Sequence, residues 1–588
     1  MTKGFVWLNS VLAVCGTVFG AAQPPSRQPN VILILTDDQG YGDLGCHGNA
    51  VVKTPHLDQF YKEAVRFTNF HVSPTCAPTR AALLTGRYND DTGVWHTIKG
   101  RSLLRTDEKT LGDMFHQAGY ATGMFGKWHL GDNYEYLPEQ RGFEEVWRHG
   151  GGGIGQTPDY WGNDYFDDTY WVNGKLVKFN GFCTEVWFRG AKQFIAKEVA
   201  AKRPFFCYLA LNAPHAPYYA PEKYKQMYEN NAYGVDPGFF GMITHLDEQF
   251  GLLRTALKEL GVEDNTILIF MTDNGTSAGV ELDGKHWSDS FVVKGFNDGM
   301  RGKKGSAYEG GHRVPFFIRW PGGGISGGRD INTLSAHIDI LPTLANLCSV
   351  PPPKGRPLDG TSLVPLLRGD VAGWPQRTIC TDSQRGENLV KWKDSVVMTE
   401  RWRLVRGNEL YEIKNDPEQR TNLAGACSEI VTPLRSAYEN WWQKVSDREA
   451  VDCPISIGNT NAGTVLLTAH DWHSPDQEAI TPWDQKLICE GMQTNGFWAI
   501  RTEVSGQYRF TLRRWPAERG GKIEENFFPV KKARIQIGGI SADQPVDPGA
   551  ESVVFELPVP IGEAALQTWF IGDNESCGAY YVEVEGIR

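Results

Sequence analysis

The chain has 588 residues, a formal net charge of −11, 41% hydrophobic residues and 22% charged residues. These proportions are typical of globular proteins and exclude a disordered, collagenous or multi-span membrane protein. The length exceeds the roughly 100–200 residues of one domain, so we expect several domains. The negative net charge gives no overall basic surface, and we therefore expect no nucleic-acid partner.

The N-terminus has the pattern of an export signal. Lys3 precedes a mostly apolar stretch over residues 5–19, and small residues follow at positions 20–22. This stretch is too short to span a bilayer comfortably, so we expect no stable membrane insertion. Residues 1–22 are predicted to be a signal peptide, and the protein is expected in the periplasm or outside the cell. The spacing of the eleven cysteines is not that of a zinc site. Cys15 would leave with the signal peptide, and one or two disulfides could form among the other ten in such an oxidising compartment.

The first two thirds of the chain alternate apolar runs with helical patterns. Continuous apolar runs, which predict strands buried on both faces, lie at residues 31–35, 121–125, 205–211, 266–271 and 314–318. A helical pattern over residues 111–118 is followed by Gly119, and another covers residues 336–347. This order predicts an α/β domain with a doubly wound, mostly parallel sheet over residues 28–372.

Two further units are predicted after this domain. Residues 373–450 contain strand-like runs at 395–399 and 402–406 and a helical pattern at 431–445, which indicate a small α+β subdomain. Short alternating runs then lie at residues 464–468, 497–504, 508–512, 534–537, 553–557 and 580–584. Glycine and proline separate them, so residues 455–588 are predicted to form a β-sandwich of antiparallel strands.

Polar side chains follow the predicted buried strands at the point where each strand ends. They are Asp37, Asp38, Lys127, His129, His215, Asp273 and Asn274. Because the carboxyl ends of parallel strands share one edge of a sheet, we expect these groups to meet in one crevice. Four of them are oxygen donors, a set that favours calcium, with magnesium as the alternative.

A cysteine stands where a helix is predicted to begin. Pro78 suits the first turn of a helix, which places Cys76 at its N-terminus. Backbone N–H groups at that end favour an anion, and Arg80 adds a positive charge. This setting predicts that Cys76 is a nucleophile of low pKa beside an oxyanion site.

Several segments resemble the type I sulfatases of the alkaline-phosphatase-like superfamily. Cys76-Ala77-Pro78-Thr79-Arg80 with its Leu84-Thr85-Gly86-Arg87 continuation resembles the family's signature, and Gly126-Lys127-Trp128-His129 resembles its second signature. Residues 304–315 resemble the segment that carries a lysine of the site. The resemblance covers about residues 30–445. This chain departs from it at Thr79, where serine is commonest, and at Lys303, where relatives often have glycine.

The resemblance implies a sulfuric ester hydrolase of the arylsulfatase type. Cys76 would be oxidised to formylglycine by a formylglycine-generating enzyme and hydrated, and one of its hydroxyls would attack the sulfur of a sulfate ester. His129 would then take the proton of the other hydroxyl as sulfate leaves. The metal would be bound by Asp37, Asp38, Asp273, Asn274 and the modified Cys76. Arg80 and Lys127 would hold the modified residue, while Lys304 and His215 would contact the sulfate, one of them protonating the leaving oxygen.

The substrate is predicted from an aromatic, glycine-rich stretch over residues 149–171. Its Trp161 and His149, together with His96, are candidate substrate contacts, and a wet aromatic rim suits sugar rings. A sulfated carbohydrate is therefore favoured. Two alternatives stay open at this point. One is a phosphonate monoester or phosphodiester hydrolase of the same superfamily, and the other is a catalytically silent glycan-binding protein in which Cys76 is unmodified.

Overall fold

The computed structural model describes residues 1–2, 28–284, 286–474 and 480–587, so all but the first two residues of the predicted signal peptide lie outside the described part. Within that part, no helix combines the length and the apolar character needed to cross a membrane. The ten cysteines described are all free, so the disulfides considered from the sequence do not occur among them.

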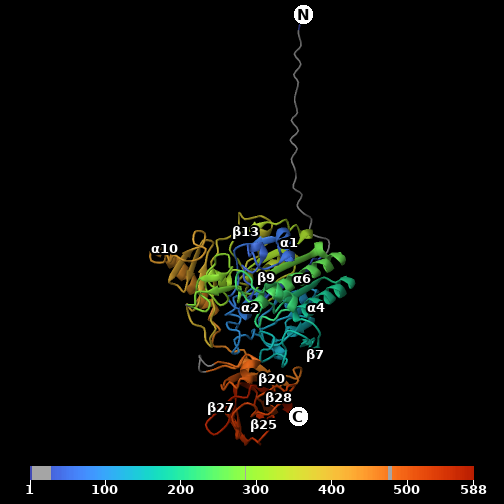
Figure 1. Ribbon diagram of the computed structural model, residues 1–588, viewed down its shortest axis with the longest axis vertical. Helices are drawn as coiled ribbons and strands as arrows, with labels where there is room; N and C mark the ends of the chain where they lie inside the picture. The colour runs from blue at the N-terminus through green and yellow to red at the C-terminus, as the bar shows by residue number, and fades with distance from the viewer. Residues whose placement is uncertain (3–27, 285, 475–479, 588) are drawn as a thin grey trace.

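A ten-stranded mixed sheet forms the centre of the large body in Figure 1. In spatial order its strands are β13 (Asp330–Ile331), β2 (Val65–Phe67), β12 (Phe316–Arg319), β9 (Thr266–Thr272), β1 (Asn30–Thr36), β8 (Phe205–Ala210), β4 (Ala121–Gly126), β5 (Glu145–Arg148), β6 (Thr169–Val172) and β7 (Lys175–Lys178). The five strands from β9 to β5 are parallel to one another. The predicted α/β fold with a mostly parallel sheet is thus confirmed.

Helices cover both faces of this sheet. One face packs against α1 (Pro55–Glu63), α4 (Cys183–Ala200) and α6 (Pro237–Glu259), and the other against α2 (Cys76–Thr85), α3 (Leu111–Gln117) and α8 (Ile340–Cys348). Side chains of β1 alternate between the two layers, with Leu33 in one core cluster and Ile34 in the other. Burial on both faces explains why β1 is a continuous apolar run.

Two details differ from the prediction. The strand expected at residues 314–318 is β12, which starts at Phe316 and runs antiparallel to β9. β12 therefore begins at the edge of the sheet where β9 ends, and it runs in the opposite direction to β9. The helix expected from residue 336 begins at Ile340, because Ser335–Ala336 pair with β3 (Phe70–His71) as strand β14.

The small subdomain has a four-stranded antiparallel sheet with one long helix against it. Its elements are β15 (Ile379–Thr381), β16 (Val396–Met398), β17 (Trp402–Val405), β18 (Glu409–Glu412) and α10 (Ser428–Val445). Both strand-like runs and the helix predicted here are present. Further short elements of the α/β domain are α5 (Glu222–Lys225), β10 (Val280–Leu282), β11 (Val292–Gly295), α7 (Glu309–His312) and α9 (Val364–Leu367).

The C-terminal β-rich unit consists of two sheets around their own core. One sheet has β19 (Ile455–Ile457), β21 (Phe497–Thr502), β26 (Gly562–Ile571), β23 (Lys532–Ile537), β24 (Ile540–Pro545) and β27 (Ser576–Cys577), and the other has β20 (Val465–Thr468), β28 (Tyr581–Ile587), β22 (Gly506–Arg513) and β25 (Val553–Val559). All pairs are antiparallel except β19 with β21. A short helix, α11 (Gln485–Cys489), precedes β21.

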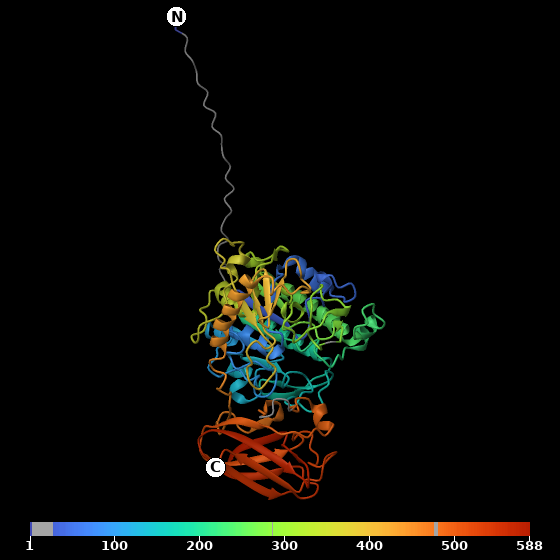
Figure 2. The ribbon, with the colours of Figure 1, turned by 90° about the vertical axis from the view of Figure 1, so that its left-hand side faces the viewer.

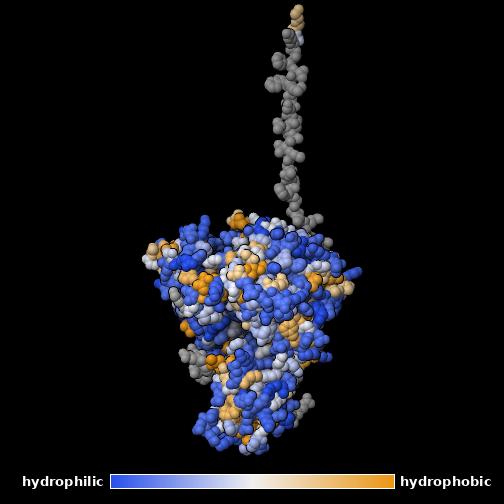
Figure 3. Space-filling model, viewed as in Figure 1, coloured by the Kyte–Doolittle hydropathy of each residue, from blue (hydrophilic) through white to orange (hydrophobic). Residues whose placement is uncertain are grey.

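This unit lies at one end of the molecule, against loops of the α/β domain (Figure 2). The Tyr136 hydroxyl donates to the Pro454 carbonyl at 2.8 Å, and the Lys99 amide donates to the His470 carbonyl at 2.9 Å. Figure 3 shows that the face in view is mostly hydrophilic, with apolar residues in small scattered groups. The C-terminal unit is therefore packed onto the rest of the chain through specific polar contacts.

Candidate active site

Four oxygen-bearing side chains meet at the carboxyl edge of the central sheet. Asp37 and Asp38 follow β1, and Asp273 and Asn274 follow the neighbouring β9. The Asp38 amide donates to Asp273 Oδ1 at 3.1 Å, and Asn274 Nδ2 donates to Asp38 Oδ1 at 2.9 Å. Donor atoms of Asp37, Asp38 and His215 lie within 4.8 Å of one another. The strands bring the predicted ligands together.

The donor set fits a divalent cation. Asp37 Oδ1 and Asn274 Oδ1 are buried without a hydrogen-bond partner, although buried carboxylate and amide oxygens are normally paired. Burial, followed by the neighbouring Asp37, raises the pKa of Asp273 above its usual range. A bound cation would satisfy both orphaned oxygens and remove the repulsion between the carboxylates.

Buried cations balance these carboxylates. Arg80 donates from Nη2 to Asp273 Oδ2 at 2.9 Å and from Nη1 to the Lys127 carbonyl at 2.9 Å. Lys127 Nζ donates to Asp37 Oδ2 at 2.7 Å, and Lys304 Nζ lies 2.6 Å from Asp38 Oδ1. Burial opposes the charge of Lys304, but Asp38 raises its pKa above the usual range, so its ammonium group is charged.

Cys76 is the first residue of α2, as the sequence predicts, and is buried. It lies at the floor of a cavity of about 250 Å³. His129, His215 and Lys304 line the same cavity. The helix N-terminus and the charged groups around it provide the electropositive setting expected for an anion.

His129 is held in one tautomer. Its Nε2 lies 2.8 Å from the Thr97 carbonyl, which can only accept, so Nε2 carries the hydrogen. Burial and the nearby Lys127 lower the pKa of His129 well below its usual value, leaving a neutral ring whose buried Nδ1 has no partner. Gly152 packs on this ring, and a Cβ at that position would lie 2.3 Å from His129 Nε2. His129 Nδ1 is therefore available to accept a proton.

The walls of the cavity come from segments far apart in the sequence. Its lining comprises Cys76, His96, Thr97, Ile98, His129, Gly152, Gln156, His215, Lys304, Arg385 and Trp483. Arg385 belongs to the small subdomain and Trp483 to the C-terminal unit. The predicted contact His96 is part of this lining, whereas Gln156, Arg385 and Trp483 were not predicted. No local signal marks them, since their place depends on how separate units pack.

Comparison with known proteins agrees with this geometry. A family model described as Sulfatase matches residues 29–350, which is more than half of the chain. The chain belongs to the sulfatase family. A second model, described as N-sulphoglucosamine sulphohydrolase, C-terminal, matches residues 302–442. The sulfatase family implies a divalent metal and a formylglycine residue.

Individual relatives cover most of the same region. N-acetylgalactosamine-6-sulfatase of Canis lupus familiaris is 31% identical over 382 residues, covering 61% of this chain and 69% of that protein. Ulvan-active sulfatase of Formosa agariphila is 30% identical over 429 residues, covering 68% of this chain and 78% of that protein. The crystal structure of Ps i-CgsB in complex with k-i-k-neocarrahexaose has a TM-score of 0.63 and 29% identity, covering 71% of this chain and 93% of that one.

Two predicted substrate contacts of this sulfatase do not line the cavity. His149 is buried, and its Nδ1 donates to the Gly150 carbonyl at 2.8 Å. Trp161 packs edge-on against Trp515 of the C-terminal unit, with ring centroids 5.4 Å apart. The position of Trp161 therefore supports a contact between units, and its predicted role in binding substrate gains no support from this geometry.

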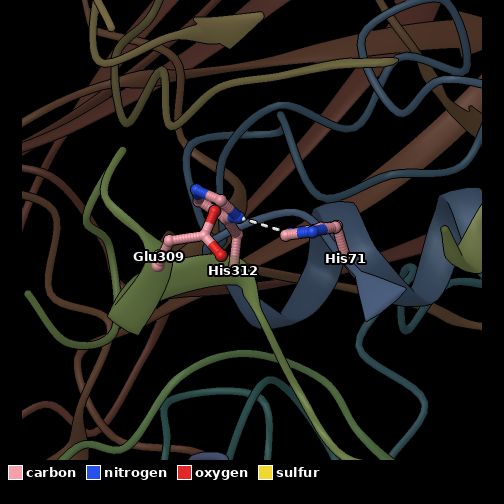
Figure 4. A group of neighbouring side chains, drawn as sticks. All are labelled: His71, Glu309 and His312. Atoms are coloured by element: carbon pink, nitrogen blue, oxygen red, sulfur yellow. Dashed lines mark hydrogen bonds between the residues drawn. The ribbon is translucent and has the colours of Figure 1, made fainter. Parts of the chain in front are cut away.

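The sulfatase has a second cluster of metal-type side chains, formed by His71, Glu309 and His312 (Figure 4). The two histidines share a hydrogen bond between their Nδ1 atoms at 2.9 Å. Fully buried Arg403 donates from Nε to Glu309 Oε1 at 2.6 Å, and its Nη2 lies 3.3 Å from His71 Nε2. Because the guanidinium already balances the carboxylate and would repel a cation, we assign this cluster to packing between α7 and the small subdomain.

Proposed function

We propose that this sulfatase hydrolyses sulfate esters of carbohydrates after export from the cytoplasm. The observation that carries the proposal is the cavity that joins Cys76, His129 and Lys304 at its floor to the aromatic and polar groups of Trp483 and Gln156 in its wall. The names of N-acetylgalactosamine-6-sulfatase and ulvan-active sulfatase support a carbohydrate substrate. The pattern of residues 1–22 supports export.

The proposed metal is calcium. Asp37, Asp38, Asp273 and Asn274 would hold it, and the all-oxygen donor set with two orphaned atoms supports this choice. When bound, the ion would supply positive charge that stabilises negative charge developing on the sulfate.

The chain's own residues have separable roles around this centre. Formylglycine at Cys76, hydrated to a geminal diol, supplies a hydroxyl oxygen that would bond to sulfur as the bond between sulfur and the alcohol oxygen breaks. His129 accepts a proton at Nδ1, while its Nε2–H bond to the Thr97 carbonyl fixes the ring. Arg80, held by Asp273, and Lys127, held by Asp37, keep the modified residue in place. Lys304 and His215 contact the sulfate, and one of them protonates the leaving oxygen.

The function is tested by sulfate release from a panel of substrates. Protein made in a host that forms formylglycine would be given sulfated oligosaccharides, one aryl sulfate and one phosphate diester. We expect the highest kcat/KM on a sulfated oligosaccharide. A higher kcat/KM on the diester would favour the phosphodiesterase alternative. Glycan binding without sulfate release, with an unmodified thiol at Cys76, would favour the silent binding protein.

Trp483 is expected to contribute to substrate binding rather than to chemistry. Its side chain lines the cavity, while its backbone carbonyl accepts from the Thr157 amide at 2.9 Å and fixes its position. We expect Trp483→Ala to raise KM for a sulfated oligosaccharide about tenfold with little change in kcat, since loss of a wall that acts equally on substrate and transition state appears in KM. Trp483→Phe, which keeps an aromatic ring, is the matched control. A fall in kcat alone would contradict this assignment.

A further inference from the structure

A larger cavity of about 550 Å³ adjoins the one above Cys76. The two cavities share Arg385, and the consecutive residues Lys304 and Gly305 line one each. The Cys76 cavity, about 250 Å³ in volume, is smaller than the roughly 300–1,000 Å³ typical of small-molecule sites. A sulfated sugar would occupy most of this volume, and the larger cavity beyond Arg385 offers room for a neighbouring sugar.

Arg385 is an exposed residue that lines both cavities at this junction. Among the described residues it makes no hydrogen bond or ion pair within 4 Å. Its Cζ lies 4.9 Å from the centroid of the Trp287 ring. Its charge also interacts at longer range with Cys76, Asp38 and Asp394. An arginine can form two parallel hydrogen bonds to a sulfate or carboxylate. Arg385 therefore has its full donor capacity available to a ligand.

The other charged groups in the wall of the larger cavity are already engaged. Arg406 pairs with Asp394 at 2.7 Å and also with Asp289. Arg301 Nε donates to the Asp289 carbonyl at 2.9 Å. Glu409 accepts a hydrogen bond from a tyrosine hydroxyl at 2.7 Å. Each of these groups thus already has a partner, whereas Arg385 is a cation of this wall whose hydrogen-bond donors face the junction without an acceptor among the described residues.

The backbone around Arg385 is fixed by buried contacts. Arg385 has a φ of +40°, in the left-handed region that side chains rarely adopt. On one side, Gln384 accepts from the Val390 amide at 2.8 Å. On the other, the Gly386 carbonyl accepts from Trp95 Nε1 at 3.2 Å. The loop thus holds the base of the side chain in place while its guanidinium faces the cavities.

Trp287 gives the larger cavity an aromatic wall, with 59% of its surface exposed. Its indole packs against Gly305, where a Cβ would lie 2.8 Å from the ring. Gly305 also has a φ of +86°. Both the positive φ and the nearby indole therefore favour glycine at this position. An exposed indole next to a cation suits a sugar ring that bears an anionic group.

We propose that the larger cavity binds the sugar next to the one that loses its sulfate, and that Arg385 pairs with a second anionic group, a sulfate or a carboxylate, on that sugar. This inference rests on the proposed carbohydrate sulfatase activity. Arg385 would act as a specificity residue for oligosaccharides that carry two charges on adjacent rings. A protein with a net charge of −11 cannot attract such a polyanion as a whole, so local cations of this kind must do so.

The test compares three disaccharides that share one scissile sulfate. The first has no other charge, the second has a sulfate on the neighbouring ring, and the third has a carboxylate there. We expect Arg385→Gln to lower kcat/KM about ten- to hundredfold on a doubly charged disaccharide, as for a lost charge-assisted hydrogen bond, and to change it less than about threefold on the singly charged one. Arg385→Lys should retain part of the preference. Arg401→Gln, which removes an exposed charge in the same subdomain, is the matched control.

The outcomes separate this inference from the function on which it rests. A loss confined to the second or the third disaccharide supports the inference and identifies the anion as sulfate or carboxylate. An equal loss on all three disaccharides would place Arg385 on the scissile sulfate and overturn the inference, as would no loss on any. If the unmutated protein with formylglycine at position 76 releases sulfate only from an aryl sulfate, the carbohydrate proposal itself is wrong, and the inference with it.

Discussion

Replacing Cys76 by alanine is expected to lower kcat/KM for sulfate release by at least about 10⁴-fold, to the background of the assay, because removal of a covalent nucleophile eliminates the pathway it supports. The side chain is buried at the start of α2, so the methyl group of alanine fits the space without disturbing the helix. Sulfate release would be measured by ion chromatography, and unfolding temperature would show that the fold is intact.

Cys489→Ala provides the control for this experiment, since Cys489 is an exposed cysteine of the C-terminal unit. Its kcat/KM should stay within about twofold of the parent, as expected for a surface substitution away from the site. The mass of the peptide containing Cys76 in the parent protein shows whether formylglycine has formed. Substantial activity in Cys76→Ala with unchanged kinetics would contradict the assignment of the nucleophile.

Replacing Asn274 by alanine is expected to weaken binding of the divalent metal about a hundredfold or more, because even groups outside the direct ligands change metal affinity by 10–100-fold. Its Oδ1 is buried without a partner, whereas its Nδ2 bonds to Asp38. Calcium binding to the metal-stripped proteins would be measured by titration calorimetry. Activity of the variant should be low at limiting calcium and recover with excess calcium.

The stability of the metal-free protein separates this role from a purely structural one. Removing an unsatisfied buried oxygen relieves a desolvation cost, so the metal-free variant should unfold within about 1 kcal/mol of the metal-free parent. The parent, but not the variant, should gain stability when calcium is added at low concentration. Equal stabilisation of both proteins by calcium would show that Asn274 is not a ligand.

The meeting of the four oxygen-bearing side chains that follow β1 and β9 could be predicted because their positions follow from local patterns. Asp37 and Asp273 come directly after apolar runs, and the pairing of β1 with β9 brings such strand ends together. Lys304 has no such local signal, and only the resemblance to the family singled it out. The start of α8 could have been placed better, since Pro342 suits the first turn of a helix and thus argues for a start near Ile340.

The cavity walls could not be predicted, for a physical reason. Arg385 and Trp483 are distant from the catalytic motifs in the sequence and reach the cavity only because two later units dock on the α/β domain. Docking depends on contacts such as the ion pair between Arg101 of the α/β domain and Glu387 of the small subdomain at 3.2 Å, which joins residues 286 positions apart. The same packing takes Trp161 to Trp515, although its aromatic neighbourhood in the sequence suggested a sugar contact.

Different parts of the chain supply the reacting groups and one side of the cavity wall. The groups assigned to bond breaking all lie between Asp37 and Lys304, whereas Arg385 and Trp483 come from the remainder of the chain. If the proposed carbohydrate substrate is right, mutations in the later segments would alter which sugars bind while the reacting groups stay unchanged. Under the proposed function, exchanging the segment after about residue 373 between homologues would therefore change the part of the wall that Arg385 and Trp483 form and leave Cys76, His129 and Lys304 in place.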